Sequence, residues 1–315
     1  MSTAAEVGHK AERVRILSDK GFRILTMLAA WFGVLVLVLL TWEVASGAMP
    51  AIEKFGWNFF TNDRWNPPRE NFGAAPMIYG TLVTAFIALL IATPLGVGVG
   101  IFLTEDYLHP HVRNVIKFMV EMLAAIPSVI YGLWGLFTVV PITKEVGMYL
   151  YNNFRGIPLF STPPSGPGIL PASVVLAIMV LPTIAALSRV SLANVPSLLK
   201  SGALALGATR WEVIFKVTLP TAWIGIVGAV VLALGRALGE TMALAMLVGN
   251  NNQISPSILA PGSTIAAALA NNFGDATGMQ VAALMYLSLI LLGITLLVNI
   301  IAELILGKAV DVSAR

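Results

Sequence analysis

The sequence predicts an all-α, polytopic membrane protein with six transmembrane helices. Hydrophobic residues make up 57% of the 315 residues and charged residues only 11%, whereas soluble domains carry about 25% charged residues. Six apolar segments each exceed the roughly 20 residues that a helix needs to cross a bilayer. The net charge of +3 does not indicate nucleic-acid binding. The predicted spans are 22–46, 75–103, 113–140, 168–190, 219–248 and 277–306.

The first apolar segment is expected to stay in the mature chain. Charges of both signs precede it, and its apolar core is longer than the roughly 7–15 residues of a signal peptide. We therefore divide the chain into a cytoplasmic N-terminal segment, a first helix with its outer loop, a core transmembrane domain and a cytoplasmic tail. The four parts are 1–21, 22–74, 75–306 and 307–315.

The positions of lysine and arginine predict that both termini are cytoplasmic. Cytoplasmic loops of membrane proteins carry an excess of these residues, and most of the 19 fall on the side of the termini. On that side are Lys10, Arg13, Arg15, Lys20, Arg23, Arg113, Lys117, Arg189, Lys200, Arg210, Lys216, Lys308 and Arg315. The other side carries Lys54, Arg64, Arg69, Lys144 and Arg155.

The chain has no energy-converting machinery of its own. It contains no cysteine, no soluble domain and no Gly-x-x-x-x-Gly-Lys-Ser/Thr phosphate loop, and no histidine falls within a predicted span. We therefore expect no catalytic residue, no metal and no cofactor in this chain. The outer loop 249–278 contains one short helical pattern, which Ser263 or Thr264 would cap.

The longest cytoplasmic loop, 189–220, predicts two short helices joined by a glycine turn. Pro196 suits a first helical turn and Gly207 a helix stop, while Thr209 and Glu212 form a capping box. Leu219-Pro220 ends the second helix and opens the fifth span. The pair lies on the membrane or docks in the groove of a partner, and the missing machinery favours a partner. The contact residues would be Leu199, Ala203, Leu206, Gly207, Ala208, Thr209, Trp211 and Glu212.

Arg236 and Glu240 place two opposite charges in the fifth apolar segment. An ionisable residue in mid-membrane costs roughly 2.5–3.5 kcal/mol on insertion scales and indicates a functional site. Arg236 lies near the middle of this segment, and one helical turn separates it from Glu240, so the two residues share a face. They either neutralise each other or line a path. An arginine fork suits an oxyanion, and a carboxylate can accept a hydrogen bond from a protonated one. Phosphate at neutral pH keeps such a proton and sulfate does not, which favours phosphate.

Other polar residues in the apolar segments are candidates for the same path. Glu121, in the third segment, would pair with Arg236, with a partner subunit, or with interfacial water. Pro127 frees a backbone carbonyl, so Ser128 and Tyr131 beside it can offer polar groups. The alternating glycines in TPLGVGVG, residues 93–100, indicate close helix packing or a hinge.

The cytoplasmic loop resembles the coupling motif of ABC-importer permeases. That motif is Glu-Ala-Ala, three residues, Gly, nine residues, then Ile-x-Leu-Pro. Here Ser201-Gly202-Ala203 stands for the triplet, Gly207 matches the glycine, and 217–220 reads Val-Thr-Leu-Pro. The acidic residue of the triplet is absent, which weakens any ion pair that the family would make there. The two short helices and their glycine turn, which together we call the knob, do not depend on that residue. In that family the loop sits in a cleft of a cytoplasmic ATPase subunit.

The stretch GRALGETMALAMLVGN, residues 235–250, is similar to the signature of inorganic-phosphate permeases, the PstC type of ABC importer. Sulfate and molybdate permeases share RALGE but continue with Phe-Gly in place of Thr241-Met242. The run IPSVIYG, residues 126–132, also resembles the phosphate type. The likeness extends over about residues 75–305.

The resemblance implies the ABC type I importer permease fold and a place in the cell inner membrane. It also implies a second permease subunit of PstA type, a dimeric ATPase of PstB type that binds ATP and magnesium, and an external phosphate-binding protein of PstS type. The path residues would be Arg236, Glu240, Thr241, Ser128, Tyr131 and Glu121. Two alternatives remain: a sulfate or molybdate permease, and a proton-coupled secondary anion transporter. The secondary transporter would leave the Gly207 loop unexplained and would be expected to contain inverted repeats.

Overall fold

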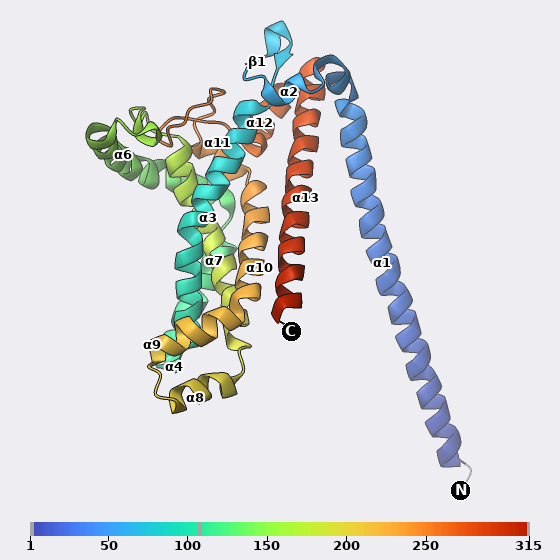
Figure 1. Cartoon of the computed structure of the whole chain (residues 1–315). Helices are drawn as coiled ribbons and strands as arrows, with labels where there is room; N and C mark the ends of the chain where they lie inside the picture. Colours follow the sequence, from blue (N-terminus) through green and yellow to red (C-terminus); the bar gives the residue numbers. More distant parts are fainter. Residues whose placement is uncertain (1–2, 106–108, 314–315) are drawn as a thin grey trace.

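The computed structural model describes residues 3–105 and 109–313, and it shows a long helical bundle with one helix standing apart (Figure 1). Within these residues, six helical stretches are long and apolar enough to cross a membrane. The number of predicted spans is therefore confirmed. The side chains of residues 1–20, Lys308 and Arg315, which entered the orientation prediction, lie outside the described part. The six stretches are Gly21–Phe55, Ala75–Thr104, Ser128–Phe154, Ile169–Ala193, Arg210–Leu238 and Met279–Leu304.

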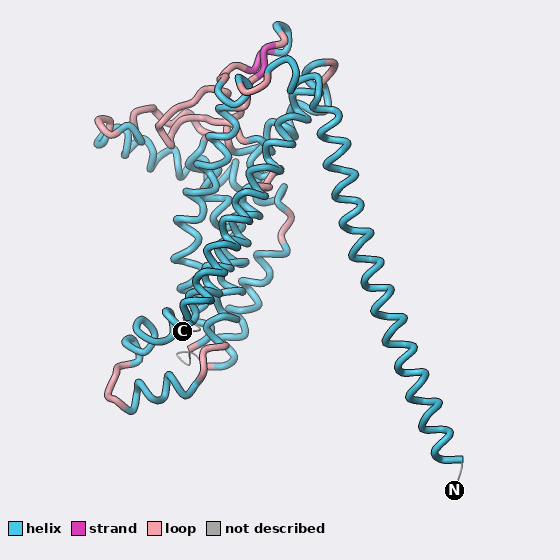
Figure 2. Tube along the Cα trace, turned by 45° about the vertical axis from the view of Figure 1, so that its right-hand side comes forward, coloured by secondary structure: helices cyan, strands magenta, loops and turns pink. Residues whose placement is uncertain are grey.

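The first helix, α1 (Thr3–Phe55), is much longer than the predicted segment 22–46. Its outer end packs against α13 (Met279–Ser313), and a Cβ on Gly47 would lie 3.3 Å from the Met285 side chain. Ala48 and Ala51 are fully buried there. Towards its other end α1 diverges from the bundle (Figures 1 and 2), and residues 21–40 are all exposed.

A small cap covers the outer ends of α1 and α13. It consists of α2 (Asn58–Thr61), η1 (Pro67–Arg69) and a two-stranded antiparallel hairpin of β1 (Trp65–Asn66) and β2 (Asn71–Phe72). Its aromatic rings fill a second core, in which Phe59 stacks on Tyr286 with ring centroids 4.5 Å apart. The cap thus fixes α1 to the bundle at the outer end only.

The centre of the bundle is α7 (Ile169–Ala193), which packs along α3 (Ala75–Thr104). Gly96 and Gly100 lie in this contact. A Cβ on Gly96 would come within 2.8 Å of Ile184 Cγ2, and one on Gly100 within 3.2 Å of the Arg189 backbone nitrogen. The predicted close packing of the alternating glycines is therefore confirmed for these two positions. Small residues allow membrane helices to approach in this way.

The third predicted span, 113–140, is wrong as a single helix. The chain forms α4 (Pro110–Ala125), α5 (Ser128–Trp134), a π-helical segment η2 (Gly135–Val139) and α6 (Val140–Phe154). The break falls at Ile126 and Pro127, where both backbones are extended, because a residue before proline disfavours the helical conformation. Beyond the break α6 projects sideways from the outer end of the bundle (Figure 1).

The fifth predicted span, 219–248, is also interrupted. α9 (Arg210–Val213) continues through a π-helical segment, η4 (Ile214–Thr218), into α10 (Leu219–Leu238). The prediction that Leu219-Pro220 separates two helices is therefore wrong. A π-helical segment, rather than a break, precedes Pro220, which has no amide proton to donate. α10 ends at Gly239, and α11 (Met242–Leu247) begins after three non-helical residues.

The remaining elements are short. α8 (Ser197–Ala205) lies beside α9 at the end of the molecule opposite the cap (Figure 1). α12 (Ile265–Asn272) is the predicted outer helix, and Thr264 caps it by accepting a hydrogen bond from the Ala267 amide at 3.2 Å. η3 (Pro158–Phe160) and η5 (Phe273–Asp275) are single turns in the outer loops.

Gly96→Val should destabilise the bundle, whereas Gly98→Val should not. Extra side-chain atoms in a well-packed core cost typically 1–3 kcal/mol, and Gly96 faces Ile184. A Cβ on Gly98, two residues away on the same helix, would have nothing within 4 Å. Thermal unfolding of the two variants in the same detergent measures the difference. Equal melting temperatures would contradict the close α3–α7 contact.

Candidate functional site

Arg236 lies in the last turn of α10, not in the middle of a continuous helix. Its side chain is exposed on the surface of the chain, and its Nη1 donates a hydrogen bond to Thr183 Oγ1 on α7 at 3.3 Å. The C-terminal end of a helix carries partial negative charge and unpaired carbonyls, and both favour a cation there. The end of α10 thus reduces the cost of placing a guanidinium within a membrane-spanning segment.

Glu240 lies beyond the end of α10. Gly239 is the C-cap residue, and Glu240 and Thr241 lie between α10 and α11. The four-residue spacing therefore does not bring Arg236 and Glu240 onto one helix face, and that prediction is wrong. Among the ion pairs of the described residues, none joins the two side chains. The Glu240 side chain is half-buried, and it does not neutralise Arg236 at ion-pair distance.

Two further predicted residues, Tyr131 and Thr241, lie around the same helix end. Tyr131 is buried on α5, and its hydroxyl donates to the Leu123 carbonyl at 2.8 Å, across the break at Pro127. It belongs to the same core cluster as Ala237 and Leu238 of the last turn of α10. Thr241 is half-buried, and its hydroxyl donates to the Gly239 carbonyl at 3.1 Å. The hydroxyls thus hold the two helix breaks in shape.

Contact between α5 and α11 joins the two interrupted spans. A Cβ on Gly132 would come within 2.7 Å of Met246 Sδ and 3.2 Å of Ala243 Cα, so a side chain here would crowd both residues. Ser128 is the first residue of α5 and is half-buried. The structure therefore places α5, which carries Ser128 and Tyr131, beside α11, which directly follows Glu240 and Thr241 in the chain.

Glu121 lies on α4 and not on the helices that carry the other predicted path residues. It is exposed on α4, and its carboxylate lies 3.7 Å from Lys117 Nζ one turn away, an ion pair that does not involve Arg236. Thr183, in contrast, was missed by sequence reasoning although it contacts Arg236 directly. The only sequence signal is a hydroxyl directly after Pro182 inside an apolar segment, and hydroxyls of that kind are common in membrane helices.

The two-helix loop of residues 189–220 has the predicted local structure. After α8, the Gly207 amide bonds to the Leu204 carbonyl and the Ala208 amide to the Ala203 carbonyl, which together form a Schellman motif. Gly207 has φ of +88°, a conformation that favours glycine. Thr209 and Glu212 exchange the two hydrogen bonds of a capping box. Pro196 is the N-cap residue rather than the first helical residue.

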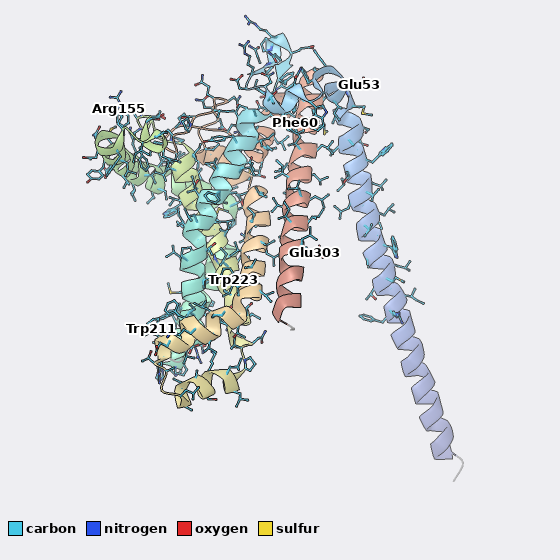
Figure 3. The ribbon with its side chains drawn as sticks, in the orientation of Figure 1. Glu53, Phe60, Arg155, Trp211, Trp223 and Glu303 are labelled. Carbon is cyan, nitrogen blue, oxygen red and sulfur yellow. The ribbon has the colours of Figure 1, made fainter. Side chains whose placement is uncertain are left out.

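This loop presents apolar side chains at its surface. Leu206 is 91% exposed and Trp211 is 60% exposed, and Trp211 stacks against Phe215 with ring centroids 6.1 Å apart. Figure 3 shows Trp211 near the end of the bundle opposite the cap. A cleft of about 360 Å³ lies between α8 and α9, lined by Ala203, Leu206, Gly207, Ala208, Glu212, Lys216 and Val217. The predicted knob is therefore present as a compact, exposed surface.

A larger hollow elsewhere in the bundle is not suited to an anion. It has a volume of about 430 Å³ and lies among α3, α10 and α13. Every residue that lines it is apolar: Leu82, Val83, Ala85, Phe86, Leu89, Leu234, Leu238 and Val298. It offers no hydrogen-bond donor to a charged ligand.

Comparison with known proteins identifies the family. The family model of the binding-protein-dependent transport system inner membrane component matches residues 96–307. The chain belongs to this family. It is therefore a multi-pass inner-membrane component of a transport system.

Curated relatives of this inner-membrane component include phosphate permeases from bacteria and an archaeon. The phosphate transport system permease protein PstC of Mesorhizobium japonicum is 46% identical over 93% of this chain and 91% of its own. PstC of Haemophilus influenzae is 46% identical over 89% of this chain and 91% of its own. A probable PstC of Methanocaldococcus jannaschii is 38% identical over 89% and 91%.

Solved structures confirm the fold of ABC-importer permeases. A chain of a bacterial alginate ABC transporter superposes with a TM-score of 0.56, covering 90% of this chain and 94% of its own at 17% identity. A chain of the MetNI methionine ABC transporter gives a TM-score of 0.54, covering 73% and 93% at 19% identity. Identities this low establish the fold of this inner-membrane component but not its substrate.

Thr209→Val should loosen the start of α9. Loss of a capping side chain costs typically about 1 kcal/mol, so the Glu212 amide should exchange its hydrogen about fivefold faster. Hydrogen exchange of the peptide that covers 209–216 measures this. Thr221→Val is the matched control, because that hydroxyl bonds only back to the Val217 carbonyl. Unchanged exchange in Thr209→Val would show that the capping box does not hold the loop.

Proposed function

We propose that this chain is the permease subunit of an ATP-driven importer of inorganic phosphate. Two independent observations support this. The curated relatives that cover nine-tenths of the chain are named phosphate permeases. Within the fold, a guanidinium stands at the end of a membrane-spanning helix with a hydroxyl and no carboxylate as its hydrogen-bond partner. The position of this guanidinium is the observation on which the proposed mechanism rests, because an arginine fork suits an oxyanion.

In this proposal Arg236 meets phosphate on its way through the membrane. Its guanidinium offers planar donors to two phosphate oxygens, and Thr183 holds the side chain at the end of α10. Ser128, Tyr131, Thr241 and Glu121 contribute further polar groups along the path. Binding here must be weak, because a site that conducts must also release its ligand. High affinity then belongs to the external binding protein.

Glu240 gives this path a preference for a protonated anion. Phosphate at neutral pH keeps a proton that it can donate to the carboxylate, whereas sulfate has none. Repulsion between the carboxylate and a fully ionised anion adds to this difference. The geometry supports a separate role for Glu240, since it does not pair with Arg236.

The exposed α8–α9 surface couples this movement to a partner. ATP and magnesium bind to a dimeric ATPase of PstB type, whose cleft receives Leu206, Trp211 and the rest of the knob. A second permease of PstA type completes the path, and a binding protein of PstS type delivers phosphate from outside. This assignment places α8, α9 and both termini on the cytoplasmic side, as the distribution of lysine and arginine predicts.

Arg236→Gln should reduce ATP-driven phosphate uptake about ten- to hundredfold, because hydrogen bonds to charged groups are worth about 1.5–3 kcal/mol. The measurement uses liposomes that contain the complete importer and labelled phosphate, with and without excess sulfate. Arg155→Gln is the control of equal charge, since Arg155 is exposed on the outer side and contacts only the Tyr151 ring in the described part.

Each alternative predicts a different result in the same assay. Competition by sulfate or molybdate would indicate a permease for those anions. Uptake driven by a proton gradient without ATP would indicate a secondary transporter. Normal uptake by Arg236→Gln with an assembled ATPase would show that the arginine has only a structural role.

A further inference from the structure

A basic cleft lies at the end of the bundle that carries α8 and α9, away from the Arg236 site. It has a volume of about 300 Å³ and opens between the ends of α3 and α7 and the first turns of α4. The residues that line it come from all three helices. They are Leu103, Thr104, Arg113, Asn114, Lys117, Arg189 and Ala193.

Three of these residues bring positive charge to one small space. Arg113 and Lys117 are one turn apart on α4, and Arg189 faces them from α7. Like charges at this spacing repel each other. The Arg189 side chain is half-buried, and within residues 3–105 and 109–313 its guanidinium makes no ion pair. A partly desolvated guanidinium of this kind is stabilised by an anion.

Two carboxylates in the described part of the chain lie near the cleft, and each has another partner. Glu105, next to Thr104, is already paired with Lys200 of α8 at 2.8 Å. Glu121 lies 3.7 Å from Lys117, but both side chains are largely exposed, and such surface pairs contribute about 0–1 kcal/mol. Neither of these two carboxylates therefore forms an ion pair with Arg189.

We propose that this cleft binds the phosphate group of an anionic ligand at the cytoplasmic boundary of the membrane. Arginine forks bind phosphate oxygens in pairs, and the Asn114 amide adds a neutral donor. The cleft lies where α3 and α7 end, which is the level of lipid headgroups. Basic pockets between membrane helices on the cytoplasmic side hold such headgroups. Two sources share this chemistry: the headgroup of an anionic lipid and free inorganic phosphate.

A ligand in this cleft ties the start of α4 to α3 and α7. α4 leads directly to the break at Pro127 and to Ser128 and Tyr131, so the ligand restrains the element that positions those residues. The inference does not depend on which anion the chain transports, because none of its residues contributes to the Arg236 site.

The test counts bound lipid on the full chain in detergent by native mass spectrometry, with phosphatidylglycerol titrated against phosphatidylcholine. Wild type should retain one phosphatidylglycerol more tightly than phosphatidylcholine. Arg189→Gln should bind phosphatidylglycerol at least about tenfold more weakly, since it loses a charge-assisted pair of hydrogen bonds. Arg23→Gln is the matched control, because it removes an exposed positive charge from α1 outside the cleft.

A second arm distinguishes the two sources. Inorganic phosphate is added to the lipid-bound chain, with chloride at equal ionic strength as the control. Retention of phosphatidylglycerol identifies the lipid headgroup as the ligand, whereas displacement by phosphate identifies the free anion. If Arg189→Gln fails to fold, Lys117→Gln tests the proposal in its place. This variant must weaken phosphatidylglycerol binding at least about threefold relative to Arg23→Gln. Equal binding by wild type and the cleft variants, or no preference over phosphatidylcholine, overturns the proposal.

Discussion

The structure depends on the way the chain accommodates a guanidinium within a membrane-spanning segment. A charge at mid-helix costs several kcal/mol in lipid, and a neighbouring carboxylate on the same helix would neutralise it. This chain ends the helix instead. Because α10 stops at Gly239, Arg236 lies beside the negative end of the helix dipole and the open carbonyls of the last turn. Glu240 is carried away from it, and Thr183 on α7 becomes its partner.

In the rest of the bundle, tightly packed helix contacts and interruptions of the membrane-spanning helices lie at different places. Glycines in the α3–α7 contact and glycine between α5 and α11 bring backbones close together and leave little freedom. The polar residues lie instead at the discontinuities, namely Pro127 and the Gly239–Thr241 turn. Two π-helical segments, at 135–139 and 214–218, occur in the same two interrupted spans, and such segments are frequent at functional sites.

The second π-helical segment also links the knob to the charged site. From Arg210 to Leu238 the chain is helical without an intervening loop. A displacement of α9 by a partner is therefore transmitted along one helical element to the turn that carries Arg236. In the proposed importer, this connection would couple an ATPase bound at the knob to a path at the other end of α10.

Sequence reasoning predicted the features that depend on local rules. Hydropathy gave the six spans, and turn chemistry gave Gly207, the Thr209 capping box and the Thr264 cap. Averaged hydropathy does not detect where an apolar segment breaks, so 113–140 and 219–248 were predicted as single helices. The departure of α1 from the bundle and the Thr183–Arg236 contact depend on tertiary packing, which no single segment encodes. The path residues themselves stay a prediction.

The central claim is that the end of α10 faces a water-filled path and not lipid. Because the chain has no cysteine, single cysteines report on this directly. Thr183→Cys and Gly239→Cys, with Leu90→Cys on the exposed face of α3 as the lipid-facing comparison, are treated with a membrane-impermeant thiol reagent in the assembled importer. The account predicts fast labelling at 183 and 239 that phosphate slows, and little labelling at 90. Labelling at 183 and 239 as slow as at 90, with and without ATP, would contradict it.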